Sequence, residues 1–192
     1  MSHLVRELKP TFERLIEPLV DLLHKLGASP NLITFLGLFL VAIGSYFLYL
    51  GQNLVSLAFL LLGALCDAID GSLARRLGKS SLPLGAFLDS LVDRVSDALP
   101  FIAIALSSGN KALSFLSMLA IVFSYTVSYA RARAEGLGYE LRVGLFERPE
   151  RWVVLLLGIA LDIVLLAVLT IVVGSLFTTL QRAYIFMKIQ RR

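Results

Sequence analysis

Residues 54–93, LVSLAFLLLGALCDAIDGSLARRLGKSSLPLGAFLDSLVD, carry the most information about the fold. It contains two apolar runs, and each run is interrupted by a pair of aspartates: Asp67 and Asp70 in the first, Asp89 and Asp93 in the second. A charged carboxylate at the centre of a bilayer costs about 2.5–3.5 kcal/mol on insertion scales. Four such residues in apolar segments therefore require a compensating interaction.

The rest of the chain indicates that these runs lie in a membrane. Of the 192 residues, 57% are hydrophobic and the mean hydropathy is +0.81, more apolar surface than a soluble domain of this length can bury. Residues 32–50 and 112–130 carry no charge, and each is about long enough to cross the roughly 30 Å hydrocarbon core as a helix. We therefore predict an all-α integral membrane protein.

The distribution of polar residues predicts how the chain is organised. Residues 3–25 alternate leucines and charges with helical spacing, typical of an amphipathic helix on the membrane surface. A break at residues 27–31 leads into a bundle over residues 31–189. The last apolar stretch, residues 152–187, is predicted to be a hairpin with its turn near Asp162. We expect one domain, residues 1–192, with six transmembrane helices after the surface helix.

Basic residues predict the orientation of these helices. Lysine and arginine gather before the first span, after the second and fourth, and at the end of the chain, as expected of cytoplasmic loops. Both termini and the aspartates should then face the cytoplasm of a multi-pass cell-membrane protein. The net charge of +4 and pI near 9.4 are explained by these loops, so we expect no nucleic-acid partner. The single cysteine, Cys66, excludes an intramolecular disulfide and a multi-cysteine metal site.

The aspartate spacing predicts a metal site. Intervals of three (Asp67, Asp70) and four (Asp89, Asp93) place each pair on one helix face. If the two helices are antiparallel neighbours, the two acidic faces meet, and the four carboxylates would repel one another. Divalent cations with oxygen ligands, Mg²⁺ or Mn²⁺, would remove that repulsion, so we expect a site for two ions. The alternative is a structural network of ion pairs between the aspartates and three nearby arginines, Arg75, Arg76 and Arg94.

These residues also form a longer pattern. It reads Asp67-x-x-Asp70-Gly71-x-x-Ala74-Arg75 and, after nine residues, Gly85-x-x-x-Asp89-x-x-x-Asp93. The pattern resembles the signature of the CDP-alcohol phosphatidyltransferase family, in which eight residues usually separate the two halves. The segment Ser29-Pro30-Asn31-x-x-Thr34 is similar to that family's entry to its first span.

The resemblance implies a transferase of phospholipid biosynthesis that moves a phosphatidyl-type group from a CDP-linked lipid to a small alcohol and releases CMP. It implies metal ligation by Asp67, Asp70, Asp89 and Asp93, with Asp93 also the general base. It further implies that the CDP-lipid donor contacts a set of small, polar and basic residues: Asn31, Thr34, Gly71, Ala74, Arg75, Ser81 and Gly85. Homodimers are usual in the family.

A second group of residues indicates the acceptor. The segments 128–136, 147–151 and 181–182 are similar to the branch that makes phosphatidylinositol phosphate or archaetidylinositol phosphate from inositol 1-phosphate. A dianionic acceptor needs guanidinium groups, which here are Arg131, Arg148, Arg151 and Arg182. Two alternatives remain: glycerol 3-phosphate as acceptor, and a divalent-cation transporter whose aspartates form a transit site.

Overall fold

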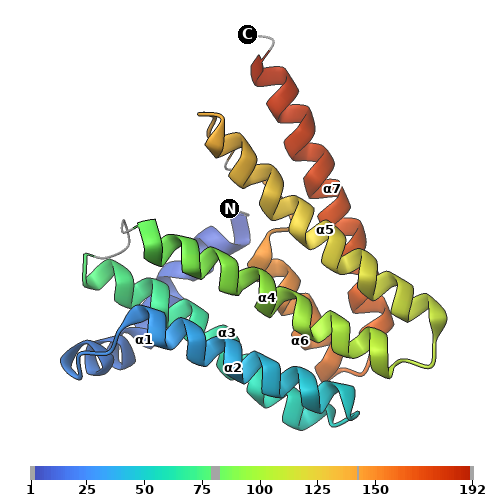
Figure 1. The fold of residues 1–192 in the computed structure, drawn as a ribbon, viewed down its shortest axis with the longest axis horizontal. Helices are drawn as coiled ribbons and strands as arrows, with labels where there is room; N and C mark the ends of the chain where they lie inside the picture. The colour runs from blue at the N-terminus through green and yellow to red at the C-terminus, as the bar shows by residue number, and fades with distance from the viewer. Residues whose placement is uncertain (1–2, 79–82, 142, 191–192) are drawn as a thin grey trace. The chain divides into compact units, whose positions relative to one another are not determined.

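The computed structural model describes residues 3–78, 83–141 and 143–190, and the regular structure in those ranges is entirely α-helical, as predicted. Seven helices follow one another along the described chain (Figure 1). Their bounds are α1 His3–Lys25, α2 Pro30–Tyr49, α3 Asn53–Arg76, α4 Pro83–Ser107, α5 Lys111–Gly136, α6 Arg148–Ala160 and α7 Val164–Gln190.

Helix ends fall where the local sequence favours a left-handed residue. Gly27 has φ +69° after α1, and the backbone of Ala28 donates to the carbonyl of Leu23 at 3.0 Å, a Schellman end. The same pattern ends α6, where Asp162 has φ 56° and Ile163 N–H donates to the Gly158 carbonyl at 2.9 Å. Asp is one of the few non-glycine residues that tolerates this conformation. The predicted hairpin turn near Asp162 is confirmed.

Four of the helices are long and apolar enough to cross a membrane: α2, α3, α5 and α7. The chain is therefore a multi-pass membrane protein. The sequence predicts six spans, two more than the four helices that meet these criteria. The helix α6 has only 13 residues, and at 1.5 Å per residue it is shorter than the hydrocarbon core. In α4 the apolar sequence is interrupted by several charged side chains.

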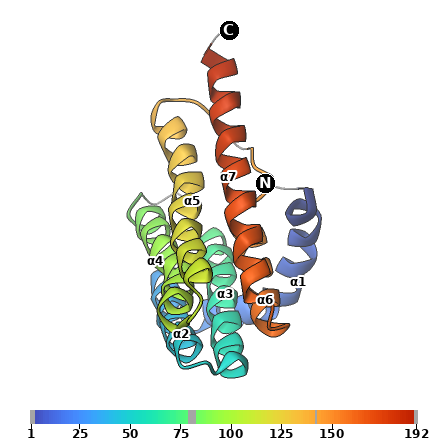
Figure 2. The same ribbon diagram turned by 90° about the vertical axis from the view of Figure 1, so that its right-hand side faces the viewer.

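The chain forms two compact units, residues 7–103 and residues 104–192 with the first six residues, and α4 runs from one into the other. In the first unit α2 and α3 lie side by side (Figures 1 and 2). Glycines allow this close approach: a Cβ at Gly63 would lie 2.5 Å from Val41 Cγ2, and one at Gly44 would lie 2.9 Å from Leu60 Cγ.

Helix α1 packs one apolar face inside the first unit. Ile16 and Val20 are buried against residues of α2 and α3, among them Ile33 and Leu73. A second set of apolar side chains on α1 is exposed: Phe12, Leu15, Leu19 and Leu22, continued just after the helix by Leu26. Because this set repeats at intervals of three and four residues, it forms a continuous stripe along the helix.

In the second unit α7 packs against both α5 and α6 (Figure 2). The segment between α5 and α6 is held against α7 at several points. Phe146 N–H donates to Thr178 Oγ1 at 3.0 Å, and a Cβ at Gly174 would lie 2.6 Å from the Phe146 ring. This segment leads directly into α6.

Candidate functional site

Three of the four predicted aspartates converge. Asp67 on α3 and Asp89 and Asp93 on α4 each place one carboxylate oxygen within 4.8 Å of the others. The C-terminal part of α3 and the N-terminal part of α4 thus form a single acidic cluster. Its members are separated by up to 26 positions in the sequence. An all-oxygen, anionic donor set of this kind suits a hard divalent cation.

The fourth aspartate has a different environment. Asp70 is only 4% exposed, and its Oδ2 accepts a hydrogen bond from the Thr34 hydroxyl of α2 at 2.6 Å. Burial of a carboxylate is costly unless it is hydrogen-bonded, so Thr34 stabilises Asp70 one helical turn from Asp67. Sequence spacing alone does not distinguish Asp70 from the other three.

Two glycines beside the carboxylates have few close neighbours among the described residues. Within that part of the chain, a Cβ added at Gly71 would meet only Arg75 Nη1, at 3.6 Å, and one at Gly85 would meet only Asn31 Oδ1, at 3.8 Å. Both distances are ordinary van der Waals contacts. Unlike Gly44 and Gly63, these two glycines are therefore not required for helix packing.

The arginines at the end of α3 pair with acids of α1. Arg75 Nη2 lies 2.8 Å from Glu13 Oε1, and Arg76 Nη1 lies 2.6 Å from Asp21 Oδ1. Arg94 Nη1 lies 3.6 Å from Asp93 Oδ2. The alternative to a metal site is a network of ion pairs between the aspartates and Arg75, Arg76 and Arg94. Two of these arginines, Arg75 and Arg76, instead pair with acids of α1.

One acidic residue near the site was not singled out from the sequence. Asp97 lies one turn beyond Asp93 on α4 and is 6% exposed. Together with Asp89 and Asp93 it forms a stripe with an interval of four residues, which places the three on one face of α4. That interval was the signal by which it could have been found.

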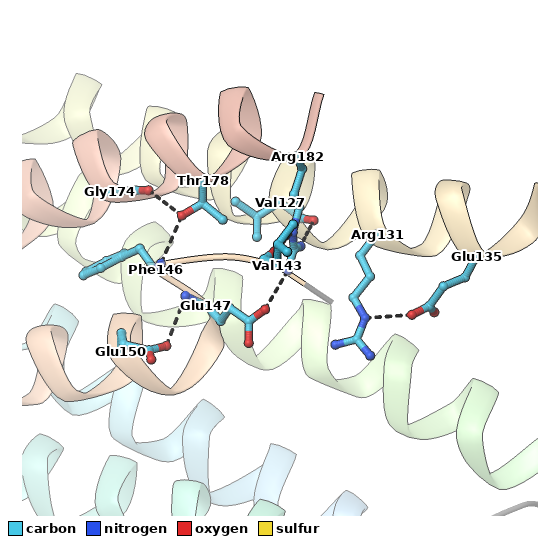
Figure 3. Close-up of polar contacts among 10 residues, drawn as sticks. All are labelled: Val127, Arg131, Glu135, Val143, Phe146, Glu147, Glu150, Gly174, Thr178 and Arg182. Carbon is cyan, nitrogen blue, oxygen red and sulfur yellow. Dashed lines mark hydrogen bonds and ion pairs between the residues drawn. The ribbon is translucent and has the colours of Figure 1, made fainter. Parts of the chain in front are cut away.

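The arginines predicted to hold an acceptor phosphate all lie in the second unit, and Figure 3 shows Arg131 and Arg182. Arg131 on α5 pairs with Glu135 at 2.9 Å on an exposed face. Arg148 is the first residue of α6 and is half-buried, whereas Arg151 is only 3% exposed. Arg182 on α7 is 2% exposed. Ala74 is half-buried on α3, and Ser81 lies outside the described residues.

Arg182 connects three parts of this unit (Figure 3). Its Nε donates to the Val143 carbonyl at 2.7 Å, and its Nη1 donates to the Val127 carbonyl of α5. Its Nη2 lies 2.7 Å from Glu147 Oε1. A buried guanidinium requires such partners, and these three fix its orientation.

Comparisons with known proteins agree with this geometry. The family model described as CDP-alcohol phosphatidyltransferase matches residues 28–181. An uncharacterised protein of Aquifex aeolicus is 54% identical over 187 residues, covering 96% of this chain and 95% of that protein. The archaetidylinositol phosphate synthase of Pyrococcus horikoshii is 35% identical over 182 residues, covering 94% and 95%.

Solved structures of Mycobacterium tuberculosis phosphatidylinositol phosphate synthase share the fold. The structure with CDP-DAG bound has a TM-score of 0.81 and 26% identity, covering 90% of this chain and 94% of that one. The complex with manganese and citrate has a TM-score of 0.79 and 26% identity, covering 88% of each chain.

Proposed function

The chain belongs to the CDP-alcohol phosphatidyltransferase family, and from that premise we propose that it transfers a phosphatidyl or archaetidyl group from a CDP-linked lipid to inositol 1-phosphate, releasing CMP. That it is a transferase of substituted phosphate groups follows from the family itself. The observation that carries the proposal is the convergence of Asp67, Asp89 and Asp93 within 4.8 Å.

The proposed cofactor is a pair of divalent cations, Mg²⁺ or Mn²⁺, held by Asp67, Asp70, Asp89 and Asp93. The oxygen-only donor set suits either ion, and the solved neighbour contains manganese. When bound, the ions would neutralise the donor's diphosphate and make CMP a better leaving group. Thr34 would keep Asp70 in one orientation through the 2.6 Å hydrogen bond.

Asp93 is the proposed general base. It would accept the proton of the acceptor hydroxyl as that oxygen attacks the lipid phosphorus and the bond to CMP breaks. The neighbouring Arg94 guanidinium lies 3.6 Å from Asp93 Oδ2, so a basic side chain is next to the proposed base.

The donor would lie over the open part of the first unit. Gly71, Ala74 and Gly85 leave room for the cytidine, and in two of these positions a Cβ would meet only one side-chain atom. Asn31 and Thr34 of α2 would also contact the donor. Arg75 would contact its phosphates, and Ser81 remains a further candidate from the sequence.

The acceptor phosphate is assigned to Arg131, Arg148, Arg151 and Arg182. Guanidinium groups bind phosphate through paired N–H donors, and the relative from Pyrococcus horikoshii is an archaetidylinositol phosphate synthase. Glycerol 3-phosphate would satisfy the same arginines, so it is the second acceptor to be tested.

The membrane arrangement is also part of the proposal. All six helices after α1 would cross the bilayer, with both termini and the active site cytoplasmic. The α1 acids pair with Arg75 and Arg76, while its exposed apolar stripe would lie in the membrane interface. We expect a homodimer, as is usual in the family.

The deciding experiment measures CMP release by the purified protein. CDP-diacylglycerol and CDP-archaeol are each supplied with inositol 1-phosphate, glycerol 3-phosphate or free inositol, with Mg²⁺ or Mn²⁺. We expect release with inositol 1-phosphate and its loss on chelation of the metal. Preference for glycerol 3-phosphate would change the product but keep the pocket, whereas preference for free inositol would refute a phosphorylated acceptor. Metal uptake without CMP release would favour a cation transporter.

A further inference from the structure

Glu147 occupies a particular place among the arginines of the second unit. It is the residue immediately before α6 and its backbone N–H donates to Glu150 Oε2 at 3.0 Å, which caps that helix. Its own carboxylate lies 2.7 Å from Arg182 Nη2 (Figure 3). The same residue therefore starts the helix that bears Arg148 and Arg151 and contacts the arginine of α7.

The segment that carries Glu147 is fixed on α7. Arg182 Nε holds the Val143 carbonyl at 2.7 Å, and Thr178 Oγ1 accepts the Phe146 N–H at 3.0 Å. A Cβ at Gly144 would lie 3.0 Å from both Glu147 Cγ and Thr178 Cγ2. Glycine at position 144 therefore lets this segment pass close to Glu147 and Thr178, and the two hydrogen bonds hold the segment on α7.

Within the described part of the chain, Arg182 has more N–H donors than partners that accept them. A guanidinium has five N–H groups, and Val143, Val127 and Glu147 take one from each of its three nitrogens. Counted over the described residues, one N–H remains on each terminal nitrogen, and these are the donors that the inference assigns to a phosphate. Its orientation is determined by the three partners.

We propose that Glu147 is a positioning residue for the acceptor's phosphate: it orients Arg182 and couples it to the start of α6 without touching the acceptor itself. The inference rests on the proposed function, because it assigns the orienting role within that acceptor pocket. It concerns Glu147, to which the family signature gives no role.

Charge and geometry predict opposite effects at this position. Glu147 is an anion beside a pocket for an anion, so simple electrostatics predicts that removing its charge strengthens phosphate binding. Positioning predicts instead that what matters is an oxygen at the right distance from Arg182. Glu147→Gln keeps the reach and loses the charge, whereas Glu147→Asp keeps the charge and loses one methylene of reach.

The first measurement is CMP release against acceptor concentration for the full-length protein and each variant. We expect Glu147→Asp to raise the KM for inositol 1-phosphate about tenfold, the effect of losing one charge-assisted contact. Glu147→Gln should stay within about threefold of wild type, a difference of less than 1 kcal/mol. The KM for CDP-lipid should be unchanged in both. Asp21→Ala is the matched control, because Asp21 also pairs with an arginine, Arg76, but through exposed side chains where ion pairs contribute little.

A second readout does not depend on turnover. Trp152 is the only tryptophan in the chain and is half-buried next to Arg151 on α6. Its emission should change on titration with inositol 1-phosphate or glycerol 3-phosphate, at about tenfold higher concentration for Glu147→Asp than for wild type. In addition, Glu147→Ala should add nothing to the loss caused by Arg182→Ala, because residues that act through one another are not additive.

The outcomes separate the inference from the proposed function. Wild type that shows neither CMP release nor a Trp152 response with either phosphorylated acceptor overturns both. If wild type is active but Glu147→Asp has the same KM for inositol 1-phosphate as the control Asp21→Ala, only the role of Glu147 is overturned. That role is likewise overturned by a Glu147→Gln variant that binds the acceptor more tightly than wild type, which indicates simple electrostatics, or by an equal rise in the KM values for donor and acceptor, which indicates general loss of structure.

Discussion

Asp93 shows how a single residue can be tested in the proposed mechanism. Replacing it with Asn removes the base but leaves the size of the side chain and the other three carboxylates in place. We expect turnover to fall about 10²–10⁴-fold, the usual effect of losing a catalytic base, with CDP-lipid binding largely retained. The measurements are CMP release and binding of labelled CDP-lipid. Near-normal turnover would remove Asp93 from the chemistry.

Asp97→Asn is the matched control for that experiment. It changes the next aspartate on the same face of α4 by the same substitution. Because Asp97 is buried, its variant reports the effect of altering a buried carboxylate in this helix. A specific role for Asp93 requires a clearly larger loss of turnover in its own variant, at equal thermal stability.

Arg148 is the most direct test of the acceptor pocket, since it is half-buried while Arg151 and Arg182 are almost fully buried. Arg148→Ala should remove a charge-assisted contact of roughly 1.5–3 kcal/mol, which lowers acceptor affinity about one to two orders of magnitude. Lysine should rescue this only in part, because it lacks the paired donors. The measurement is KM for inositol 1-phosphate. An increase confined to the KM for CDP-lipid would place Arg148 at the donor instead.

At the scale of the helices, the glycines of α3 divide into two kinds. A Cβ at Gly63 would lie 2.5 Å from Val41 Cγ2, whereas one at Gly71 would meet only Arg75 Nη1 at 3.6 Å. Gly63→Ala should therefore cost about 1–3 kcal/mol of stability by overpacking. Gly71→Ala should leave stability equal or slightly higher, because alanine favours helix by about 0.5–1 kcal/mol.

The effect on donor binding should be the reverse of the effect on stability: Gly71→Ala, the variant that keeps its stability, should be the one that weakens donor binding. If Gly71 leaves room for the cytidine, Gly71→Ala should weaken CDP-lipid binding about tenfold or more, which is at least 1.4 kcal/mol, without lowering the unfolding temperature. Thermal unfolding in detergent and CDP-lipid binding are measured on both variants. A Gly71→Ala protein with normal donor affinity would show that the space beside Asp70 is not used by the donor.

At the scale of the whole molecule, the six-span topology can be tested by cysteine labelling. On a Cys66→Ser background, single cysteines at Gln52, Gly109 and Leu161 should react with an impermeant thiol reagent from outside the cell. Those at Ser29, Lys79 and Leu137 should react only after the membrane is opened. Gly109 is preferred to Asn110, whose side chain caps α5 by accepting from Ala112 N–H at 2.9 Å.

The outcome at Leu137 has the most consequences. It lies in the loop between α5 and α6, next to the segment that carries Glu147. Labelling of this position from outside would contradict the proposed orientation, because the arginines of the second unit would then lie on the opposite side of the membrane from the aspartates. Protection of Leu161 in intact cells would instead indicate that α6, with its 13 residues, does not cross.

The sequence by itself determined the helical class, the helix breaks and the family. These depend on local features: apolar runs of membrane length, glycine at helix ends, and aspartates at intervals of three and four that must share a helix face. The convergence of Asp67 with Asp89 and Asp93 was predicted in the same way, because a short loop joins the two helices. The prediction of six membrane spans went further than length and composition support for α4 and α6.

Only the tertiary structure decided which partner each side chain has. Asp70 is hydrogen-bonded to Thr34, 36 residues away, and Arg182 pairs with Glu147, 35 residues away; no periodicity within one helix specifies either contact. Likewise Gly63 and Gly71 are equivalent in the sequence of α3, but a Cβ at Gly63 would clash with Val41 of α2, whereas one at Gly71 would make an ordinary contact with Arg75 Nη1. Helical periodicity fixes the face on which a residue lies, whereas the packing of distant segments determines what that face meets.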